Sequence, residues 1–458
     1  MSLLSVDVAV IGAGAAGMTA SVALAGLGLQ VVLLDEQGSP GGQIYRGITL
    51  APLSRRDMLG PDYAHGNTLA QALAASTVRY EKGAAVWQVT REHKVSYLRD
   101  GRLQTVQARA VLLATGAMER PFPIPGWTLP GVMSAGAAQI LLKSSGLAPA
   151  EPVVLAGCGP LLYLLGWQYL RAGVQIKALV DTTRPEDYWR ARRHLFAALR
   201  AWPYLRKGLD LMRSLRSAGI AHYTGAEQLA VEGSEAASAL TFSVGGKAQR
   251  VATRCVLLHQ GVVPNIQFSQ SLRARHHWDE NQLCFSPVSD AWGQLDVPGI
   301  YVAGDGAGIG GAQAAALQGK LAALGIASRL GRLSDAERER QAAPLRTGLE
   351  ANLRIRPFLD AVYQAREENR IPADEVMVCR CEEVSAGELR KFVALGCAGP
   401  NQAKAFGRCG MGPCQGRMCG LTVTEVIAKA RGVSAGEVGY YRIRPPIKPI
   451  TLGELAGE

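Results

Sequence analysis

Residues 6–18 read VDVAVIGAGAAGM, an apolar segment that runs directly into three glycines with the spacing G-x-G-x-x-G. The first of them, Gly12, permits a tight turn, and Gly14 lets the backbone approach a pyrophosphate. Gly17 lets a helix pack closely against the strand, and Ala16 lies in the same turn. The apolar residues that follow are predicted to form a helix whose N-terminus holds the phosphate charge.

A second strand, predicted for residues 31–34, ends at two acids about twenty positions after the glycine turn. An acid at this distance accepts hydrogen bonds from an adenosine ribose. Asp35 and Glu36 are both candidates, and we favour Glu36 because it ends the strand where the ribose should lie. The order of strand, turn, helix, strand and acid therefore predicts a dinucleotide site.

Three later segments are predicted to complete this site. A glycine loop at residues 41–43 can bring backbone N–H groups to the phosphates or ribityl chain of a flavin. Apolar strands at residues 111–114 and 300–303 each end in a glycine turn, and an Asp in the second turn suits a ribityl hydroxyl. The contacts predicted here are Gly42, Gln43, Val86, Thr115, Gly116, Gly304 and Asp305.

These segments resemble the FAD/NAD-dependent pyridine nucleotide–disulfide oxidoreductase superfamily over roughly the first 330 residues. The resemblance implies an α/β fold with two Rossmann-like domains, the NAD-type domain being inserted into the FAD domain. It implies FAD contacts from Glu36, Gln43, Thr115 and Asp305. The predicted boundaries are residues 1–122 and 263–335 for the two parts of the FAD domain and 123–262 for the NAD(P)-binding-like domain.

The second glycine fingerprint, in residues 153–162, departs from the pattern. Its strand leads into Gly157 and Gly159, but Leu162 stands where the third glycine is expected. A leucine there crowds the helix against the strand or forces a wider turn. Asp181 provides a second acidic strand end. We therefore expect an NAD-type fold and leave open whether it binds NAD, another adenine nucleotide or nothing.

The sequence excludes one chemistry that the superfamily name suggests. It contains no C-x-x-C pair, and a dithiol–disulfide reductase needs two cysteines within bonding distance beside the flavin. The seven histidines show no spacing typical of a metal site or a catalytic triad. No residue of this chain is therefore predicted to be catalytic.

Six of the nine cysteines fall between Cys379 and Cys419, which indicates a metal site rather than disulfides in a reducing compartment. Four thiolates can hold a [2Fe-2S] cluster, two on each iron. Cys379 and Cys381 are one residue apart, so both sulfurs can face one metal from a strand end or turn.

The second ligand pair is ambiguous, because Cys409/Cys414 and Cys414/Cys419 have the same spacing. We choose Cys414 and Cys419, since a helix predicted over residues 421–430 would offer its N-terminal N–H groups to the anionic cluster. Cys397 is left out of the ligand set. A structural zinc site with the same four thiolates is the alternative, and a set of buried free cysteines is the blander one.

The residues around these cysteines resemble a bacterioferritin-associated-ferredoxin-like [2Fe-2S] domain, namely CRCEEV at 379–384 and GMGPCQGR at 410–417. With GGQIYR at 41–46, PGWTLPGV at 125–132 and RPPIKP at 444–449, the resemblance covers nearly the whole chain. The chain is similar to the FAD- and iron–sulfur-containing subunit of heteromeric amino-acid dehydrogenases. This family includes subunits of opine oxidase, hydrogen cyanide synthase, D-hydroxyproline dehydrogenase and sarcosine oxidase.

The resemblance implies an electron-transfer role in a hetero-oligomer. A partner FAD-dependent β subunit of the D-amino-acid-oxidase type would oxidise a C–N bond of an amino acid, imino acid or opine. Electrons would reach the FAD of this chain through a relay that can include FMN or FAD at the subunit interface and the cluster. A small third subunit can belong to the complex. The alternative is a self-contained NAD(P)H-dependent FAD oxidoreductase. The C-terminal part would comprise a helical linker (336–372), a [2Fe-2S] domain (373–440) and an extended tail (441–458).

The net charge of +11 invites a nucleic-acid function, but no nucleic-acid-binding signature is present. Residues 184–216 carry nine basic residues against three acids, with Trp189 and Trp202 among them. They form either a solvated helical face or a docking surface for an acidic partner or a membrane. The proline-rich tail is the better candidate for partner contact. With neither a signal peptide nor a long apolar span, a cytoplasmic location is expected, with membrane or respiratory-chain contact through the complex.

Overall fold

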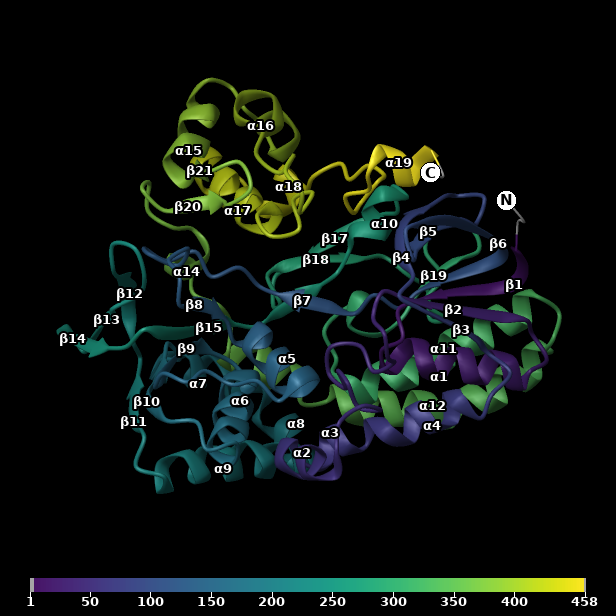
Figure 1. The fold of residues 1–458 in the computed structure, drawn as a ribbon, viewed down its shortest axis with the longest axis horizontal. Coiled ribbons are helices and arrows are strands. Elements are labelled where there is room, and N and C mark those ends of the chain that lie inside the picture. Colours follow the sequence, from purple (N-terminus) through teal and green to yellow (C-terminus); the bar gives the residue numbers. More distant parts are fainter. Residues whose placement is uncertain (1–3, 457–458) are drawn as a thin grey trace.

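The protein was analysed as a computed structural model that describes residues 4–456 (Figure 1). Its first sheet has the order β3-β2-β1-β6-β5-β4, and β19 pairs in parallel with the C-terminal end of β6. The strands are β1 (Leu4–Ile11), β2 (Val31–Asp35), β3 (Arg79–Lys82), β4 (Ala85–Val89), β5 (Lys94–Arg99), β6 (Arg102–Leu113) and β19 (Ile300–Val302). Strands β1, β2, β3, β6 and β19 run parallel, so their carboxyl ends meet at one edge.

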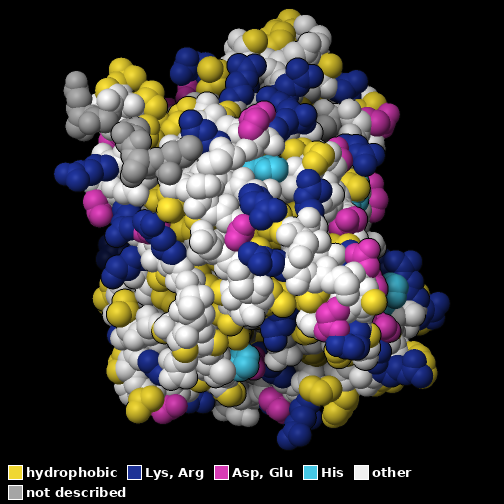
Figure 2. All heavy atoms as spheres, turned by 90° about the vertical axis from the view of Figure 1, so that its right-hand side faces the viewer, with side chains coloured by type: hydrophobic (Ala, Val, Ile, Leu, Met, Phe, Trp, Pro, Cys, Tyr) yellow, Lys and Arg dark blue, Asp and Glu magenta, His cyan; other side chains and the backbone are white. Residues whose placement is uncertain are grey.

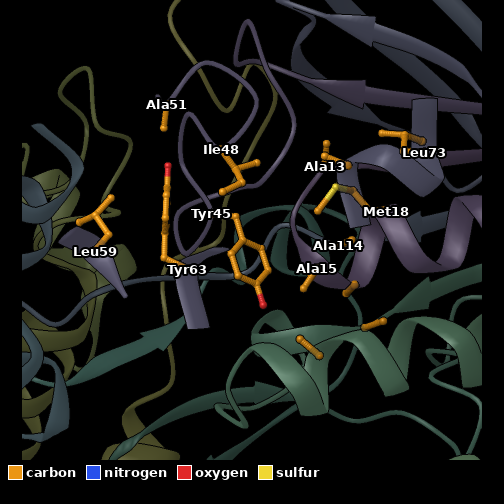
Figure 3. Close-up of a cluster of buried hydrophobic side chains, with 14 of the residues drawn as sticks. Ala13, Ala15, Met18, Tyr45, Ile48, Ala51, Leu59, Tyr63, Leu73 and Ala114 are labelled. Atoms are coloured by element: carbon orange, nitrogen blue, oxygen red, sulfur yellow. The ribbon is translucent and has the colours of Figure 1, made fainter. Parts of the chain in front are cut away.

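Two helices rich in small residues, α1 (Ala15–Gly26) and α11 (Ala312–Arg329), pack side by side under this sheet (Figure 1). Their small side chains let the backbones approach closely, and the Thr19 hydroxyl donates to the carbonyl of Ala316 at 2.9 Å. Figure 3 shows Tyr45 and Ile48, from the loop after β2, packed near Ala13 and Met18 at the start of α1. The outer helices are α2 (Leu53–Leu59), α3 (Pro61–Ala64), α4 (Gly66–Ala74) and α12 (Asp335–Leu353).

The inserted part has a second, all-parallel sheet in the order β11-β10-β9-β15-β8. The chain enters and leaves this part through the antiparallel pair β7 (Ala117–Glu119) and β16 (Val262–Pro264). The sheet strands are β8 (Val132–Ser134), β9 (Val153–Cys158), β10 (Ile176–Asp181), β11 (Ala221–Thr224) and β15 (Cys255–Gln260). The helices are α5 (Ala135–Ser145), α6 (Pro160–Arg171), α7 (Pro185–Ala191), α8 (Leu195–Arg200) and α9 (Trp202–Ser217). A separate antiparallel sheet comprises β12 (Glu227–Glu232), β13 (Ala239–Val244) and β14 (Lys247–Ala252).

A small, mainly helical domain forms the upper part of Figure 1. It contains β20 (Met377–Cys379), β21 (Val384–Ser385), α15 (Ala386–Ala394), α16 (Pro400–Gly407), α17 (Gly420–Arg431) and α18 (Ala435–Val438). It is held on the inserted part by Trp127, whose indole N–H donates to the carbonyl of Met377 at 2.8 Å, and by the Arg380 guanidinium, which lies over the Trp127 ring. The remaining elements are α10 (Gln267–Ser271), β17 (His276–Asp279), β18 (Cys284–Pro287), α13 (Arg356–Val362), α14 (Glu367–Arg370) and α19 (Leu452–Ala456).

Basic side chains are spread over the face of the molecule that Figure 2 shows, with acidic side chains scattered among them. The architecture confirms the predicted α/β fold with two Rossmann-like units and a small C-terminal helical domain. The domain boundaries given by residue number stay predictions. Within residues 4–456, every helix is too short or too polar to span a bilayer.

Candidate functional site

The main cavity of the protein, with a volume of about 600 Å³, lies at the carboxyl edge of the first sheet. All the predicted FAD contacts line it except Gly17. Gly17 lies beneath the cavity floor, where a Cβ atom would come within 1.8 Å of the carbonyl oxygen of Gly12. Its absence of a side chain is therefore required by the packing of α1 on β1 rather than by ligand contact.

The two acids at the end of β2 have different surroundings. Asp35 is buried and accepts hydrogen bonds from the backbone N–H of Ala13 at 2.7 Å and of Gln37 at 2.8 Å. Burial raises the pKa of Asp35, so these bonds are needed to keep the carboxylate charged. Glu36 lines the cavity and forms an ion pair with Lys448. The carboxylate of Asp35 thus fixes the glycine loop, which leaves Glu36 facing the ligand space.

The other walls hold their polar groups in fixed positions. Asp305 accepts hydrogen bonds through Oδ1 from the N–H groups of Gly310 and Gly311, both at 2.9 Å. The amide oxygen of Gln43 accepts a hydrogen bond from Arg46 at 2.9 Å. These contacts orient the loop after β2 and the turn after β19 toward the same cavity. Among residues 4–456, the second carboxylate oxygen of Asp305 has no hydrogen-bond partner and is available to a ligand hydroxyl.

One buried amine of the inserted part reaches this cavity and was missed by the sequence analysis. Lys143 on α5 is only 4% exposed, and its ammonium donates to the carbonyl of Gln43 at 3.2 Å and to the side chain of Gln139 at 2.7 Å. Burial, with the nearby charge of Arg46, lowers the pKa of Lys143 to about 7. No carboxylate of the described chain pairs with this amine, so an anionic ligand would stabilise its charged form.

An ionisable pair also lies at the cavity wall. Glu119, which lines the cavity, has one carboxylate oxygen 2.6 Å from Nδ1 of His259 and accepts a hydrogen bond from the N–H of Gly136 at 2.7 Å through the other. The residues are 140 positions apart, on β7 and β15, and only the fold brings them together. The sequence analysis nominated neither.

The corresponding edge of the second sheet is filled by protein side chains. Asp181 is buried, accepts a hydrogen bond from the N–H of Thr183 at 2.8 Å, and is hydrogen-bonded to the hydroxyl of Tyr163. The thiol of Cys158, in the glycine turn, donates to the carbonyl of Tyr363 at 3.6 Å. Tyr363 follows α13, so the linker covers this edge. Leu162 is fully buried, as its position in place of a glycine predicts.

Five of the six clustered cysteines meet in the C-terminal domain. The sulfurs of Cys379, Cys409 and Cys419 all lie within 4.8 Å of one another. Cys414 is in hydrogen-bonding contact with both Cys381 and Cys419. The sequence analysis brought four of these residues together and left Cys409 as an alternative, whereas the structure includes it in the tightest group.

Cys397 lies apart from this group. Its thiol donates to the carbonyl of Gly399 at 3.3 Å. The predicted separation of Cys397 from the other five cysteines is therefore seen in the fold.

The thiols form two thiolate positions. Hydrogen bonds from Cys409 and Cys419 lower the pKa of Cys379 to about 2, and a hydrogen bond from Cys419 lowers that of Cys414 to about 5. Donation to Cys379 raises the pKa of Cys409 to about 12, and burial raises that of Cys381. Thiolates at this density are typical of a metal site, because a bound cation replaces the protons that the thiols share.

The loop around these cysteines is closely packed. Gly412 faces Cys381, and a Cβ atom on this glycine would lie 2.3 Å from the Cβ of Cys381. Helix α17 begins with Cys419 as its N-cap residue, as expected from the sequence. On the other side, the hydroxyl of Tyr441 lies 3.4 Å from the sulfur of Cys409.

The C-terminal tail is not the free extended segment that the sequence suggested. Tyr441, Ile443 and Ile447 are buried in the same apolar core as the cysteines, and Lys448 lines the main cavity. The alternation of buried and exposed residues, with Arg442 and Arg444 outside, fixes the tail on the protein. The proline-rich composition was correctly interpreted as extended, but its apolar positions contact this chain.

Residues 6–319 match the pyridine nucleotide-disulphide oxidoreductase family, and residues 374–458 match the sarcosine oxidase A3 domain. The A-type subunit of opine oxidase from Agrobacterium tumefaciens (strain Ach5) is 46% identical over 460 residues, which cover 98% of this chain and 91% of that protein. This chain belongs to the family of the A-type opine oxidase subunits. Residues 6–319 thus contain the fold of an oxidoreductase family, as predicted.

More distant relatives agree with this assignment. The HcnB subunit of hydrogen cyanide synthase from Pseudomonas protegens is 32% identical, over 98% of this chain and 97% of that protein. The solved structure of L-proline dehydrogenase from P. horikoshii has a TM-score of 0.71 and 21% identity, over 99% of this chain and 80% of that chain. At this identity the likeness concerns the fold alone. The predicted resemblance to subunits of heteromeric oxidoreductases is confirmed.

Proposed function

We propose that this chain is the FAD- and [2Fe-2S]-containing electron-transfer subunit of a heteromeric dehydrogenase that oxidises a C–N bond of an amino acid, imino acid or opine. The observation that carries the proposal is the arrangement of two sites. A glycine-lined dinucleotide cavity and a five-cysteine site occur in one chain, and Arg417, from the loop between two of the cysteines, lines the cavity.

The main cavity fits FAD in its chemistry. The glycine turn before α1 leaves space for a pyrophosphate, since a Cβ atom on Gly14 would have its nearest neighbour at 3.9 Å. Glu36 would accept hydrogen bonds from the adenosine ribose and Asp305 from ribityl hydroxyls. Lys143 offers an unpaired buried cation to the anionic cofactor. FAD bound here would supply two-electron redox chemistry.

The cysteine site fits a [2Fe-2S] cluster. We propose Cys379, Cys381, Cys414 and Cys419 as its ligands, two on each iron. The contacts of Cys414 with Cys381 and Cys419 support this set, and Cys409 is the alternative to one of the second pair. A cluster bound here would supply one-electron transfer, which lets two electrons from a flavin leave singly.

The substrate site is proposed to lie on a partner flavoprotein subunit. Two relatives are named as single subunits of opine oxidase and of hydrogen cyanide synthase, which supports a multisubunit enzyme and favours an opine or a small amino acid as substrate. The polar residues at the cavity mainly hold a cofactor. The pair Glu119–His259 is already engaged in hydrogen bonds.

Helices α7–α9 are the proposed surface for the partner. They expose eight large apolar side chains, among them Trp189 at 65% and Phe196 at 69%. Arg192 lies over the ring of Trp189 and Arg200 over that of Phe196. Exposed aromatic residues with arginines are typical of protein–protein interfaces, where lysine is depleted. The exposed set is Tyr188, Trp189, Leu195, Phe196, Leu199, Trp202, Tyr204 and Leu209.

The test is to purify the chain anaerobically, by itself and with a co-expressed partner. The isolated chain should be yellow, carry about two irons and two sulfides, and show no dye reduction with a panel of opines and amino acids. Activity should appear with the partner. Turnover by the isolated chain would place the substrate site here, and zinc in place of iron would overturn the electron-transfer role.

Ligand assignment is tested by replacing single cysteines. Cys379→Ser, Cys381→Ser, Cys414→Ser and Cys419→Ser should each lose the visible absorption of the cluster. Cys397→Ser is the matched control, because this thiol lies in the same domain but outside the site. Loss of the cluster in Cys409→Ser, with survival in Cys419→Ser, would exchange these two residues in the ligand set.

A further inference from the structure

The C-terminal segment 441–448, which we call the strap, runs from the cysteine site to the dinucleotide cavity. Figure 1 shows it leaving the helical domain and crossing toward the first sheet near β4 and β5. At its start, the hydroxyl of Tyr441 lies 3.4 Å from the sulfur of Cys409 and 3.8 Å from that of Cys419. Ile443 and Ile447 are buried, so the strap is anchored along its whole length.

At its other end, the strap forms part of the cavity wall. The N–H of Ile447 donates to the carbonyl of Trp87, next to Val86 in the wall, at 3.1 Å. The ammonium of Lys448 pairs with Glu36, the residue proposed to bind the adenosine ribose. Both Ile447 and Lys448 line the cavity, on the side of the acids that end β2.

A second connection runs through the cysteine loop itself. Arg417 lies between Cys414 and Cys419, and its guanidinium donates to the carbonyl of Ile447 at 3.0 Å. Arg417 lines the same cavity. The cysteine loop and the adenosine side of the cavity are thus joined by one hydrogen bond through the strap.

We propose that the strap makes the FAD site and the cluster site one coupled binding unit, in which Lys448 positions Glu36 for the adenosine ribose. This inference rests on the proposed function, since it takes FAD and the cluster as the two ligands. A cluster orders the cysteine loop and Tyr441, and the ordered strap then holds Ile447 and Lys448 in the cavity wall. Each cofactor therefore raises the affinity for the other by the same factor, because binding free energies are linked reciprocally.

The first test isolates Lys448 at the far end of the strap. Lys448→Met keeps the aliphatic chain and removes the charge, and Arg444→Met is the matched control, since Arg444 is exposed on the same strap. The FAD dissociation constant is measured by flavin fluorescence on the deflavinated protein. We expect at least a tenfold increase for Lys448→Met, less than a twofold change for Arg444→Met, and recovery in Lys448→Arg. Unchanged cluster absorption in all three shows that the fold is kept.

A dissociation constant within twofold of wild type for Lys448→Met would overturn the role of this residue. Truncation before Ile447 provides a second variant, because it removes both cavity contacts but keeps Tyr441 and Ile443. It should weaken FAD binding at least as much as Lys448→Met while the cluster remains. Wild-type FAD affinity in the truncated protein would overturn the strap as a part of the site.

The second test measures the coupling in both directions. Cys414→Ser, which lacks the cluster, should bind FAD more weakly than Cys397→Ser by at least fivefold. In the wild-type protein, removal of FAD should speed the loss of the cluster to an iron chelator by a similar factor, a measurement that needs no variant. Equal rates of cluster loss with and without FAD would overturn the coupling. A wild-type protein that binds neither FAD nor iron would instead contradict the proposed function.

Discussion

The two dinucleotide-type domains share one architecture and differ at the edge where a ligand would bind. In the first, Asp35 accepts hydrogen bonds from its own loop, so Glu36 is left to face a cavity of about 600 Å³. In the second, Asp181 is hydrogen-bonded to Tyr163, and the linker residue Tyr363 contacts the glycine turn. The parallel sheet therefore provides the place for a site, but the side chains at its carboxyl edge decide whether a site exists.

The difference also has a functional consequence. The inserted domain contributes to the first cavity through Lys143 and Glu119–Gly136, rather than through its own glycine turn. A domain that no longer needs to bind a nucleotide can serve as a wall for the neighbouring cofactor. We regard the inserted domain as a part of the FAD site.

The largest expected effect comes from a matched pair of glycine substitutions. Gly14→Val should lower the FAD content of the purified protein at least a hundredfold, because the new side chain would fill the pyrophosphate space. The nearest atom to a Cβ on Gly14 is 3.9 Å away, so the fold should persist. Flavin absorbance per chain measures the content, and cluster absorption reports on folding.

The matching change in the second domain is Gly159→Ala. It is strained, because Gly159 has a φ of +111°, but it should leave the FAD content unchanged. Full FAD content in Gly14→Val, or loss of FAD in Gly159→Ala without loss of the fold, would reverse the roles given to the two domains.

A smaller effect concerns the contribution of the second domain to the first cavity. Burial lowers the pKa of Lys143 from 10.5 to about 7, so between about pH 7 and pH 10 the unfolded chain binds one proton more than the folded chain at this residue. The free energy of unfolding of the FAD-free protein should therefore rise with pH in this window. In Lys143→Met this contribution disappears, and the stability difference from wild type should change by up to about 4 kcal/mol across the window.

Urea denaturation of the FAD-free protein at several pH values measures this difference. Bound FAD should reduce it, because the negative charge of the cofactor favours the charged amine and raises its pKa. Lys320 on α11 is exposed, so Lys320→Met is the matched control and should not alter the pH dependence. Identical pH profiles for wild type and Lys143→Met would contradict the buried position of this amine.

The smallest expected effect is that of NADH. Because Asp181 and the glycine turn of the second domain are engaged by Tyr163 and Tyr363, NADH should reduce the flavin no faster than free FAD is reduced in the same buffer. Anaerobic stopped-flow absorbance at the flavin band tests this. Rapid, saturable reduction would mean that the linker moves away from this edge, and it would favour the alternative of a self-contained NAD(P)H oxidoreductase.

Much of the site was predictable because its residues are local in sequence. The turn from Gly12 to Gly17, the acids after β2 and the helix that begins at Cys419 each follow from short-range rules of strand, turn and helix N-terminus. The choice of Glu36 over Asp35 rests on one residue of register, and the structure supports it through the hydrogen bond from Ala13 to Asp35.

The sequence alone determined that this chain has an α/β fold with two Rossmann-like units and a cysteine-rich helical domain, since strand periodicity and glycine spacing are local signals. Only the tertiary structure decided that Lys143 and Lys448 reach one cavity, that Cys409 joins the other cysteines, and that the tail lies on this chain instead of extending from it. The physical reason is that burial and pairing depend on segments far apart in the chain. Glu36 and Lys448 lie at opposite ends of the sequence, and no local pattern indicates that folding joins them.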